Sequence, residues 1–235
     1  MSALALLLQA SELESVEAAQ AADVIVETTE KIPVWDLIMD GGWAMIPLAI
    51  LSILTIYIFV ERLLTINKSL KDEKDFMGKV KDYLMDGKVD QARDLCVQTN
   101  NPAARMVEKG ISRIGKPMRD IVSSIENVGK LEIYQLEKRL SFLATAAGVA
   151  PMIGFLGTTL GMVRTFFALK SETTIEIASI SGGIMEAMVT TVAGLVVGII
   201  AYSAYNYLVA KVDKVIHTME GASIEFLDLL NEPGK

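Results

Sequence analysis

The segment 150–167, APMIGFLGTTLGMVRTFF, is apolar enough to cross a membrane but is not uniformly apolar around the helix it would form. Small and hydroxyl residues recur on one side at three- and four-residue spacing: Gly154, Gly157, Thr158, Gly161 and Thr165. Small residues on one face let helices approach closely in lipid, and hydroxyl groups there need a hydrogen-bond partner. We therefore expect this face to contact protein or a water-filled path rather than lipid.

Composition predicts an all-α integral membrane protein with a substantial aqueous part. Of the 235 residues, 51% are hydrophobic, and the mean hydropathy is +0.40. Spans of about 20 apolar residues are expected where the chain crosses a bilayer. The predicted transmembrane helices are 42–60, 141–169 and 177–208. Between and around them lie an acidic N-terminal segment 1–41, a helical domain 61–140, a turn 170–176 and a C-terminal helix 209–235 that continues the third span.

Charge placement predicts the orientation. The stretch 61–140 carries 16 of the 22 Lys and Arg residues, whereas residues 1–42 carry eight acids and one base. The positive-inside rule then puts 61–140 and the C-terminus in the cytoplasm and the N-terminus outside, in the periplasm. Trp43 is predicted to anchor the first span at the interface, and Arg164 the second at the outer surface. The apolar run 3–8 is either a trimmed signal remnant or a surface helix.

Breaks in helical periodicity divide the stretch 61–140. Turns are expected at 86–87, 100–102 and 115–117, where Gly, Asn and Pro cluster. From Met118 the apolar pattern continues to Pro151 without another proline, which predicts one long helix entering the second span. Pro151 should kink that span or free a backbone carbonyl.

The third span repeats the small-residue pattern of the second. At about 100° per residue, one third of its circumference collects Gly183, Ala187, Thr190, Thr191, Gly194, Gly198 and Ala201. Glu186 falls at the edge of this stripe. If the two stripes pack together, they form a narrow polar seam, with Gly154, Gly157, Gly161, Gly183, Gly194 and Gly198 as packing residues.

Each polar residue in the spans has two interpretations. Glu186 could lie near the outer headgroups or pair with Arg164 or Lys170, or it could belong to a cation or proton path. Thr158, Thr159, Thr190 and Thr191 could bond back to carbonyl groups one turn earlier, or they could line that path.

Several functional classes find no support in the residues. The stretch 61–140 mixes acids with its bases and has no nucleic-acid footprint. No Cys/His cluster has zinc spacing, no nucleophile has a matching histidine, and no glycine-rich loop follows a strand. The single Cys96 is predicted to be a buried apolar residue facing a reducing compartment. We therefore expect neither an enzyme nor a cofactor.

These residues resemble the MotA/TolQ/ExbB proton-channel family, and its ExbB/TolQ branch most closely. The resemblance rests on APMIGFLGT followed by Gly161-Met162 in one span, and on GIMEA followed by Thr191 and Gly194-Leu195 in the next. The segments around Ala103-Ala104-Arg105 and up to Arg139-Leu140 are also similar. The likeness covers 43–230 and omits the acidic N-terminus. Phe155 stands where the branch usually has Leu.

The resemblance implies a ring of about five copies around single-span helices of an ExbD/TolR-like partner that carries a membrane Asp. Thr158 and Thr191 would line the proton path beside that Asp, and Glu186 would be the family glutamate. Protons would be the transported ion, although sodium coupling stays open. The complex would lie in the bacterial inner membrane.

Three functions follow as hypotheses. The first is a motor subunit that uses the proton motive force to energise outer-membrane transport through a TonB-type protein. The second is a TolQ-like unit for envelope integrity, or a gliding or flagellar stator. The third is a structural membrane scaffold without an ion path.

Overall fold

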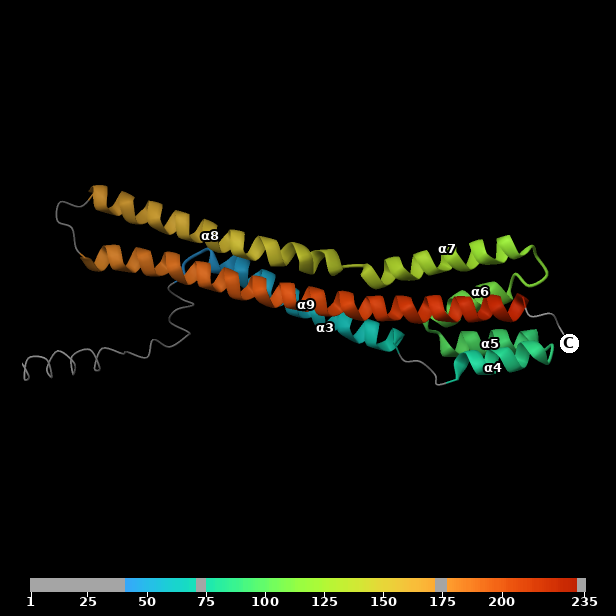
Figure 1. The fold of residues 1–235 in the computed structure, drawn as a ribbon. Coiled ribbons are helices and arrows are strands. Elements are labelled where there is room, and N and C mark those ends of the chain that lie inside the picture. Colours follow the sequence, from blue (N-terminus) through green and yellow to red (C-terminus); the bar gives the residue numbers. More distant parts are fainter. Residues whose placement is uncertain (1–40, 71–74, 172–176, 232–235) are drawn as a thin grey trace, which may run out of the picture.

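The computed structural model describes residues 41–70, 75–171 and 177–231, and the described part contains only helices (Figure 1). The predictions for 1–40 and for most of the turn 170–176 fall outside these residues. The helices are α3 (Met45–Ser69), α4 (Phe76–Met85), α5 (Val89–Thr99), α6 (Pro102–Ile111), α7 (Met118–Glu137), α8 (Leu140–Ser171) and α9 (Ile177–Asn231).

Three stretches of the described chain are long and apolar enough to cross a membrane. They are Met45–Ser69, Met118–Lys170 and Ile180–Asn231, and each overlaps one of the three predicted spans. Helix α3 continues to Ser69, beyond the predicted end of the apolar span at 60. Pro47 lies in its first turn, where the missing N–H costs little because no intrahelical partner exists there.

The longest element is α9, a single helix of 55 residues. The prediction that the third span continues into the C-terminal helix is therefore confirmed. Figure 1 shows α8 running antiparallel to the first part of α9, with α3 on the same part of the bundle. The second part of α9 runs beside α7 and reaches the cluster formed by α4, α5 and α6.

The polar end of the molecule has a core of its own around the C-terminal part of α9. Phe226 of α9, Val107 of α6 and Val80 of α4 are completely buried there. The predicted turn at 100–102 is confirmed: Asn100 has φ +47°, and the Asn101 side chain accepts a hydrogen bond of 2.7 Å from the Ala104 N–H. This is an N-cap, and Pro102 follows at the first helical position.

The turns at 86–87 and 115–117 are also confirmed. Gly87 and Gly115 have φ +74° and +88°, a left-handed conformation that glycine adopts without the steric cost of a Cβ.

An ion pair joins α6 to α7, where Arg105 binds the carboxylate of Glu132 through two hydrogen bonds of 2.7 and 2.5 Å. Glu132 is buried, so this bidentate pair satisfies a charge that would otherwise be costly.

The prediction of one unbroken helix from Met118 into the second span is wrong. Helix α7 ends at Glu137 and α8 begins at Leu140, because Lys138 is extended and Arg139 has φ +70°. Contacts with α3 stabilise this break. Arg139 donates a 2.6 Å hydrogen bond to Glu61, and the buried Arg62 donates one of 3.2 Å to the carbonyl of Gln135 in the last turn of α7.

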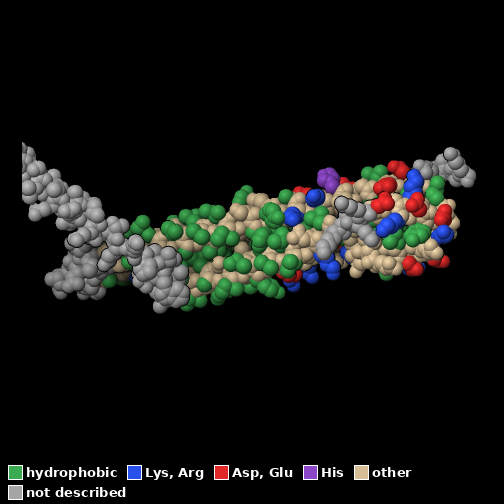
Figure 2. All heavy atoms as spheres, turned by 90° about the horizontal axis from the view of Figure 1, so that it is seen from below, with side chains coloured by type: hydrophobic (Ala, Val, Ile, Leu, Met, Phe, Trp, Pro, Cys, Tyr) green, Lys and Arg blue, Asp and Glu red, His purple; other side chains and the backbone are tan. Residues whose placement is uncertain are grey.

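Surface chemistry divides the molecule along its length. In Figure 2, hydrophobic side chains cover one half, Lys and Arg gather where that half ends, and acids appear toward the other end. The junction includes Lys68 in the last turn of α3, Arg139 at the helix break and Lys211, which bonds to Asn67 at 2.7 Å. Exposed apolar side chains such as Ile53, Phe155 and Ile199 cover the hydrophobic half and need lipid or protein around them.

Candidate functional site: the α8–α9 interface

The backbones of α8 and α9 touch along the two predicted glycine stripes. A Cβ atom on Gly154 would lie 2.9 Å from the Thr190 carbonyl oxygen, and one on Gly194 would lie 2.7 Å from the Ala150 carbonyl oxygen. Gly161 packs against Ala187 in the same way, at 3.1 Å. At Gly154 and Gly194 a Cβ would meet backbone atoms at less than 3.0 Å, so glycine at these two positions lets the helices approach this closely.

The same interface continues toward both ends of the hairpin. Gly157 lies against the side chain of Thr190 and Gly183 against that of Thr165. Toward the other end, a Cβ on Gly198 would lie 2.8 Å from the ring of Pro151 and 3.2 Å from the Ala147 carbonyl oxygen. Because proline has no N–H to offer, this carbonyl lacks its usual helical donor. The Ala147 carbonyl oxygen instead faces the backbone of α9 at Gly198.

Thr158 and Thr191 meet across this interface, and their hydroxyl groups hydrogen-bond to each other. The Thr158 hydroxyl also lies 2.9 Å from the Ala187 carbonyl oxygen and 3.3 Å from that of Gly154. The Thr191 hydroxyl lies 3.3 Å from the same Gly154 carbonyl oxygen. Two hydroxyl groups thus share two backbone acceptors from opposite helices, and their bonds can be exchanged by rotating the hydroxyl protons.

Glu186 does not join this threonine pair. Glu186 and Thr191 are five residues apart, about 140° around α9, and Arg164 and Thr158 are six residues apart, about 120° around α8. The interface therefore has two edges. We call the side with Thr158 and Thr191 the threonine edge, and the side with Arg164 and Glu186 the glutamate edge.

At the glutamate edge, Glu186 pairs with Arg164 at 3.5 Å between Oε1 and the guanidinium. Of the two predicted partners, the structure thus brings Arg164 to the carboxylate. The carboxylate also lies directly against Gly42, which has φ +60° in the turn before α3. A side chain at Gly42 would be strained by this conformation, and the Glu186 carboxylate would have to move away from it. Glu186 therefore connects α8, α9 and the start of α3.

The other predicted threonines have different surroundings. Thr190 is buried and bonds back to the Ala187 carbonyl at 2.8 Å. Thr159 is exposed and bonds back to Leu156 at 2.9 Å. Neither reaches the Thr158–Thr191 pair through a hydrogen bond within the described residues. The predicted anchor Trp43 is 47% exposed beside the start of α3.

Besides Glu132, two buried polar residues of α3 escaped the sequence prediction. Thr55 on α3 is 1% exposed and bonds back to Leu51 at 2.8 Å. Arg62 is 6% exposed, and its Nε has no hydrogen-bond partner among the described residues. Thr55 lies inside the apolar run of α3 and Arg62 just after it, and nothing in the local pattern separates a buried polar side chain from an exposed one there.

Outside the spans, Cys96 of α5 is buried, as predicted. Burial raises the pKa of its thiol to about 12, and the nearby charge of Glu108 adds to this effect. At neutral pH the group is therefore a protonated thiol that behaves as a small apolar side chain.

Comparison with known proteins identifies relatives whose names refer to biopolymer transport and to the Tol-Pal system. A biopolymer transport protein ExbB homologue of Methanothermobacter thermautotrophicus is 26% identical over 188 residues, covering 80% of this chain and 67% of that protein. The Tol-Pal system protein TolQ of Haemophilus influenzae is 37% identical over 100 residues, covering 43% and 44%. The biopolymer transport protein ExbB of Aquifex aeolicus is 36% identical over 103 residues, covering 44% and 69%.

The sequence model of one family covers more than half of the chain. It matches residues 98–221, which run from the end of α5 through α8 and into the C-terminal part of α9. The matched residues include both glycine stripes and both members of the Thr158–Thr191 pair. With three apolar helices long enough to span a bilayer, the chain is a multi-pass membrane protein. It belongs to the MotA/TolQ/ExbB proton channel family.

Proposed function

We propose that this chain is the channel subunit of an inner-membrane complex that uses the proton motive force to energise transport through a TonB-type protein. The observation that supports this most directly is the hydroxyl pair of Thr158 and Thr191 at the α8–α9 interface. Thr158 lies 13 residues before the end of α8, about 20 Å along the helix axis. A proton relay is needed at such a depth, where bulk water is absent.

The chain needs a partner to complete a proton path. The threonine pair can pass hydrogen bonds but has no ionisable group, and Glu186 lies on the other edge of the interface. A second protein with one membrane span and a carboxylate facing the threonine edge would supply the missing carrier. Protonation of that carboxylate would change its preferred hydrogen bonds with Thr158 and Thr191. The partner helix could then shift between two positions as the proton passes.

The assembly we propose is a ring of about five copies around single-span helices of an ExbD/TolR-like protein. The stretch 61–140 and the C-terminal helix would lie in the cytoplasm and the N-terminal segment in the periplasm. The gathering of Lys and Arg where the apolar half ends supports this orientation. Glu186 and Arg164 would then lie toward the periplasmic end and hold the start of α3 against the hairpin.

A TolQ-like role in envelope integrity is the second candidate, and the 37% identity to the Haemophilus influenzae TolQ favours it. Deletion of the gene separates the two roles. Loss of iron-complex or vitamin uptake supports the energiser, whereas detergent sensitivity with chained cells supports the TolQ-like role. A phenotype in neither assay would favour a scaffold without an ion path.

The biochemical test is purification from native membranes in a gentle detergent, followed by mass spectrometry. We expect a small protein with one apolar span that contains an Asp. The fold of its soluble domain would help to distinguish the two roles. A homo-oligomer without such a protein, under conditions that keep the ring intact, would contradict the proposal.

A further inference from the structure

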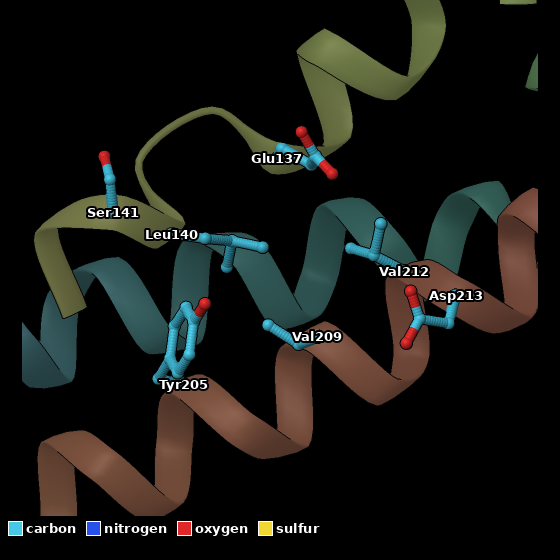
Figure 3. A pocket seen from close by; sticks show the side chains of 7 residues that line it. All are labelled: Glu137, Leu140, Ser141, Tyr205, Val209, Val212 and Asp213. Atoms are coloured by element: carbon cyan, nitrogen blue, oxygen red, sulfur yellow. The ribbon is translucent and has the colours of Figure 1, made fainter. Parts of the chain in front are cut away.

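A cavity of about 320 Å³ lies where α7 meets α8, between the helix break and α9 (Figure 3). Glu137 and Ser141 line it from the α7–α8 side, and Tyr205 and Asp213 from α9. Its apolar floor includes Leu140 and Val209. We call this the junction cavity, because it lies at the break that separates the apolar helix α8 from the more polar α7.

The junction cavity carries two carboxylates, those of Glu137 and Asp213. Within the described residues, neither Glu137 nor Asp213 takes part in an ion pair or a side-chain hydrogen bond. The acid on the other side of the same break differs, since Glu61 is bound by Arg62 and Arg139. The cavity is therefore a negatively charged opening beside a junction that is otherwise rich in Lys and Arg.

The junction cavity lies on the threonine edge of the α8–α9 interface. Leu140 is 18 residues before Thr158, and Val209 is 18 residues after Thr191. Eighteen residues make about five full helical turns, so each pair points to the same side of its helix, about 27 Å apart. Anything that lies along the threonine edge and extends toward the polar end of the molecule would meet the cavity.

We propose that the junction cavity binds Lys or Arg side chains from the cytoplasmic flank of the single-span partner. This rests on the proposed function, which places the partner helix along the threonine edge. Cytoplasmic flanks of membrane spans are enriched in Lys and Arg. A long basic side chain would lay its methylene groups on Leu140 and Val209 while its charge meets Glu137 and Asp213.

The cavity also gives the break between α7 and α8 a structural role. An unbroken helix would carry α7 straight on from α8, whereas the turn at Lys138 and Arg139 separates Glu137 from Ser141 and opens the space between them (Figure 3). Contacts from α3 on the opposite side hold this turn. Docking at the cavity would therefore fix the partner relative to both the spans and the polar domain.

The test uses photo-crosslinking in native membranes. A benzophenone amino acid replaces Ser141 in the cavity, or Leu64, which is 67% exposed on α3, as the control. Leu64 lies one helical turn after Glu61, and Glu61 binds Arg139 at the break, two residues before Ser141. Both probes therefore lie near the same depth. We expect the Ser141 probe to capture the single-span protein that co-purifies with the ring, and the Leu64 probe not to capture it.

Charge reversal then tests the chemistry of the contact. Glu137→Lys together with Asp213→Lys should lower capture at Ser141 at least about fivefold, a change typical of losing two exposed charge pairs. Glu225→Lys, at an exposed position further along α9, should leave capture unchanged. The size of the purified ring reports whether each variant still folds and assembles.

The outcomes separate this inference from the function on which it rests. If the single-span protein co-purifies but Ser141 captures only a second copy of this chain, the cavity is an interface between copies and the inference is wrong. Capture that survives charge reversal would also overturn it. If no single-span protein co-purifies with the unmodified ring, the proposed function fails and the inference fails with it.

Discussion

Thr158 and Thr191 hydrogen-bond to each other through their hydroxyl groups, although they lie on different helices and 33 residues apart. Their contact depends on the glycines around them, because Gly154 and Gly194 let the backbones of α8 and α9 touch. The pair also shares the carbonyl oxygens of Gly154 and Ala187. The glycine stripes and the polar pair are therefore parts of one arrangement.

Alanine at Gly154 or Gly194 should separate the helices. The new Cβ would lie 2.9 Å or 2.7 Å from a backbone carbonyl oxygen of the other helix, and backbone atoms cannot give way cheaply. We expect each variant to lose about 1–3 kcal/mol of stability in thermal unfolding of the detergent-solubilised protein. Gly221→Ala is the control on α9, because a Cβ there meets nothing within 4 Å. It should be neutral or stabilising, and equal losses in all three would contradict the interface.

Arg164 and Glu186 should be coupled energetically, whereas Thr158 and Glu186 should not. The first pair is in contact at 3.5 Å, and the second pair lies on opposite edges of the interface. Because Arg164 is 60% exposed in the single chain, we expect a coupling of about 0.5–1 kcal/mol from a double-mutant cycle of alanine variants. Simple additivity in the Arg164–Glu186 cycle would mean that the ion pair does not form in the membrane.

Glycine at position 139 should be tolerated better than alanine. Both substitutions remove the ion pair with Glu61, but only alanine keeps a side chain at φ +70°. The left-handed conformation costs a non-glycine residue about 1–2 kcal/mol. Arg139→Gly should therefore unfold at a higher temperature than Arg139→Ala. The reverse order would indicate that α7 and α8 form a continuous helix in solution.

Cys96 should resist alkylation in the folded protein. Its pKa is raised from 9.0 to about 12, so at neutral pH the thiolate fraction is about a thousandfold smaller than for an ordinary thiol. Mass spectrometry after iodoacetamide treatment should find little modification until denaturant is added. Rapid modification of the native protein at pH 7.5 would contradict the burial of α5 against α6.

The raised pKa of Cys96 also predicts how the stability of the protein changes with pH. Since the folded protein keeps the Cys96 proton at pH values where the unfolded chain loses it, the stability from this thiol is complete below about pH 9. It is then lost as the pH rises toward 12. Cys96→Ala should therefore show a weaker decline in stability over this range than the unmodified protein. Parallel declines in the two proteins would show that the thiol does not contribute.

Local pattern was sufficient to predict the helices, the three spans and the two glycine stripes. The helical period and the length of the apolar runs determine these features directly, and the turns at Asn100 and Gly115 are recognisable from their residue types. The break at Arg139 could not be predicted in this way, because no Gly or Pro lies there and its stabilising contact comes from Glu61, 78 residues earlier. The buried Arg62 depends on the same long-range packing.

The candidate site was predicted in part. Helical spacing placed Thr158 and Thr191 on stripes that face each other, and it placed Glu186 at the edge of its stripe. It could not determine which edge, because that depends on where α3 packs and on the contact of Gly42 with the Glu186 carboxylate. The structure therefore separates Glu186 from the Thr158–Thr191 pair, whereas the sequence analysis left all three on one possible path.

The most direct test of the proton path is partner-dependent proton flux into liposomes that contain the purified complex and a pH-sensitive dye. We predict that Thr158→Val with Thr191→Val lowers the flux at least about tenfold, because valine keeps the shape and removes the hydroxyl relay. Thr145→Val, at an exposed threonine that bonds back to Ser141, should leave the flux unchanged. An undiminished flux in the double variant, with the ring and partner still assembled, would contradict a path through this pair.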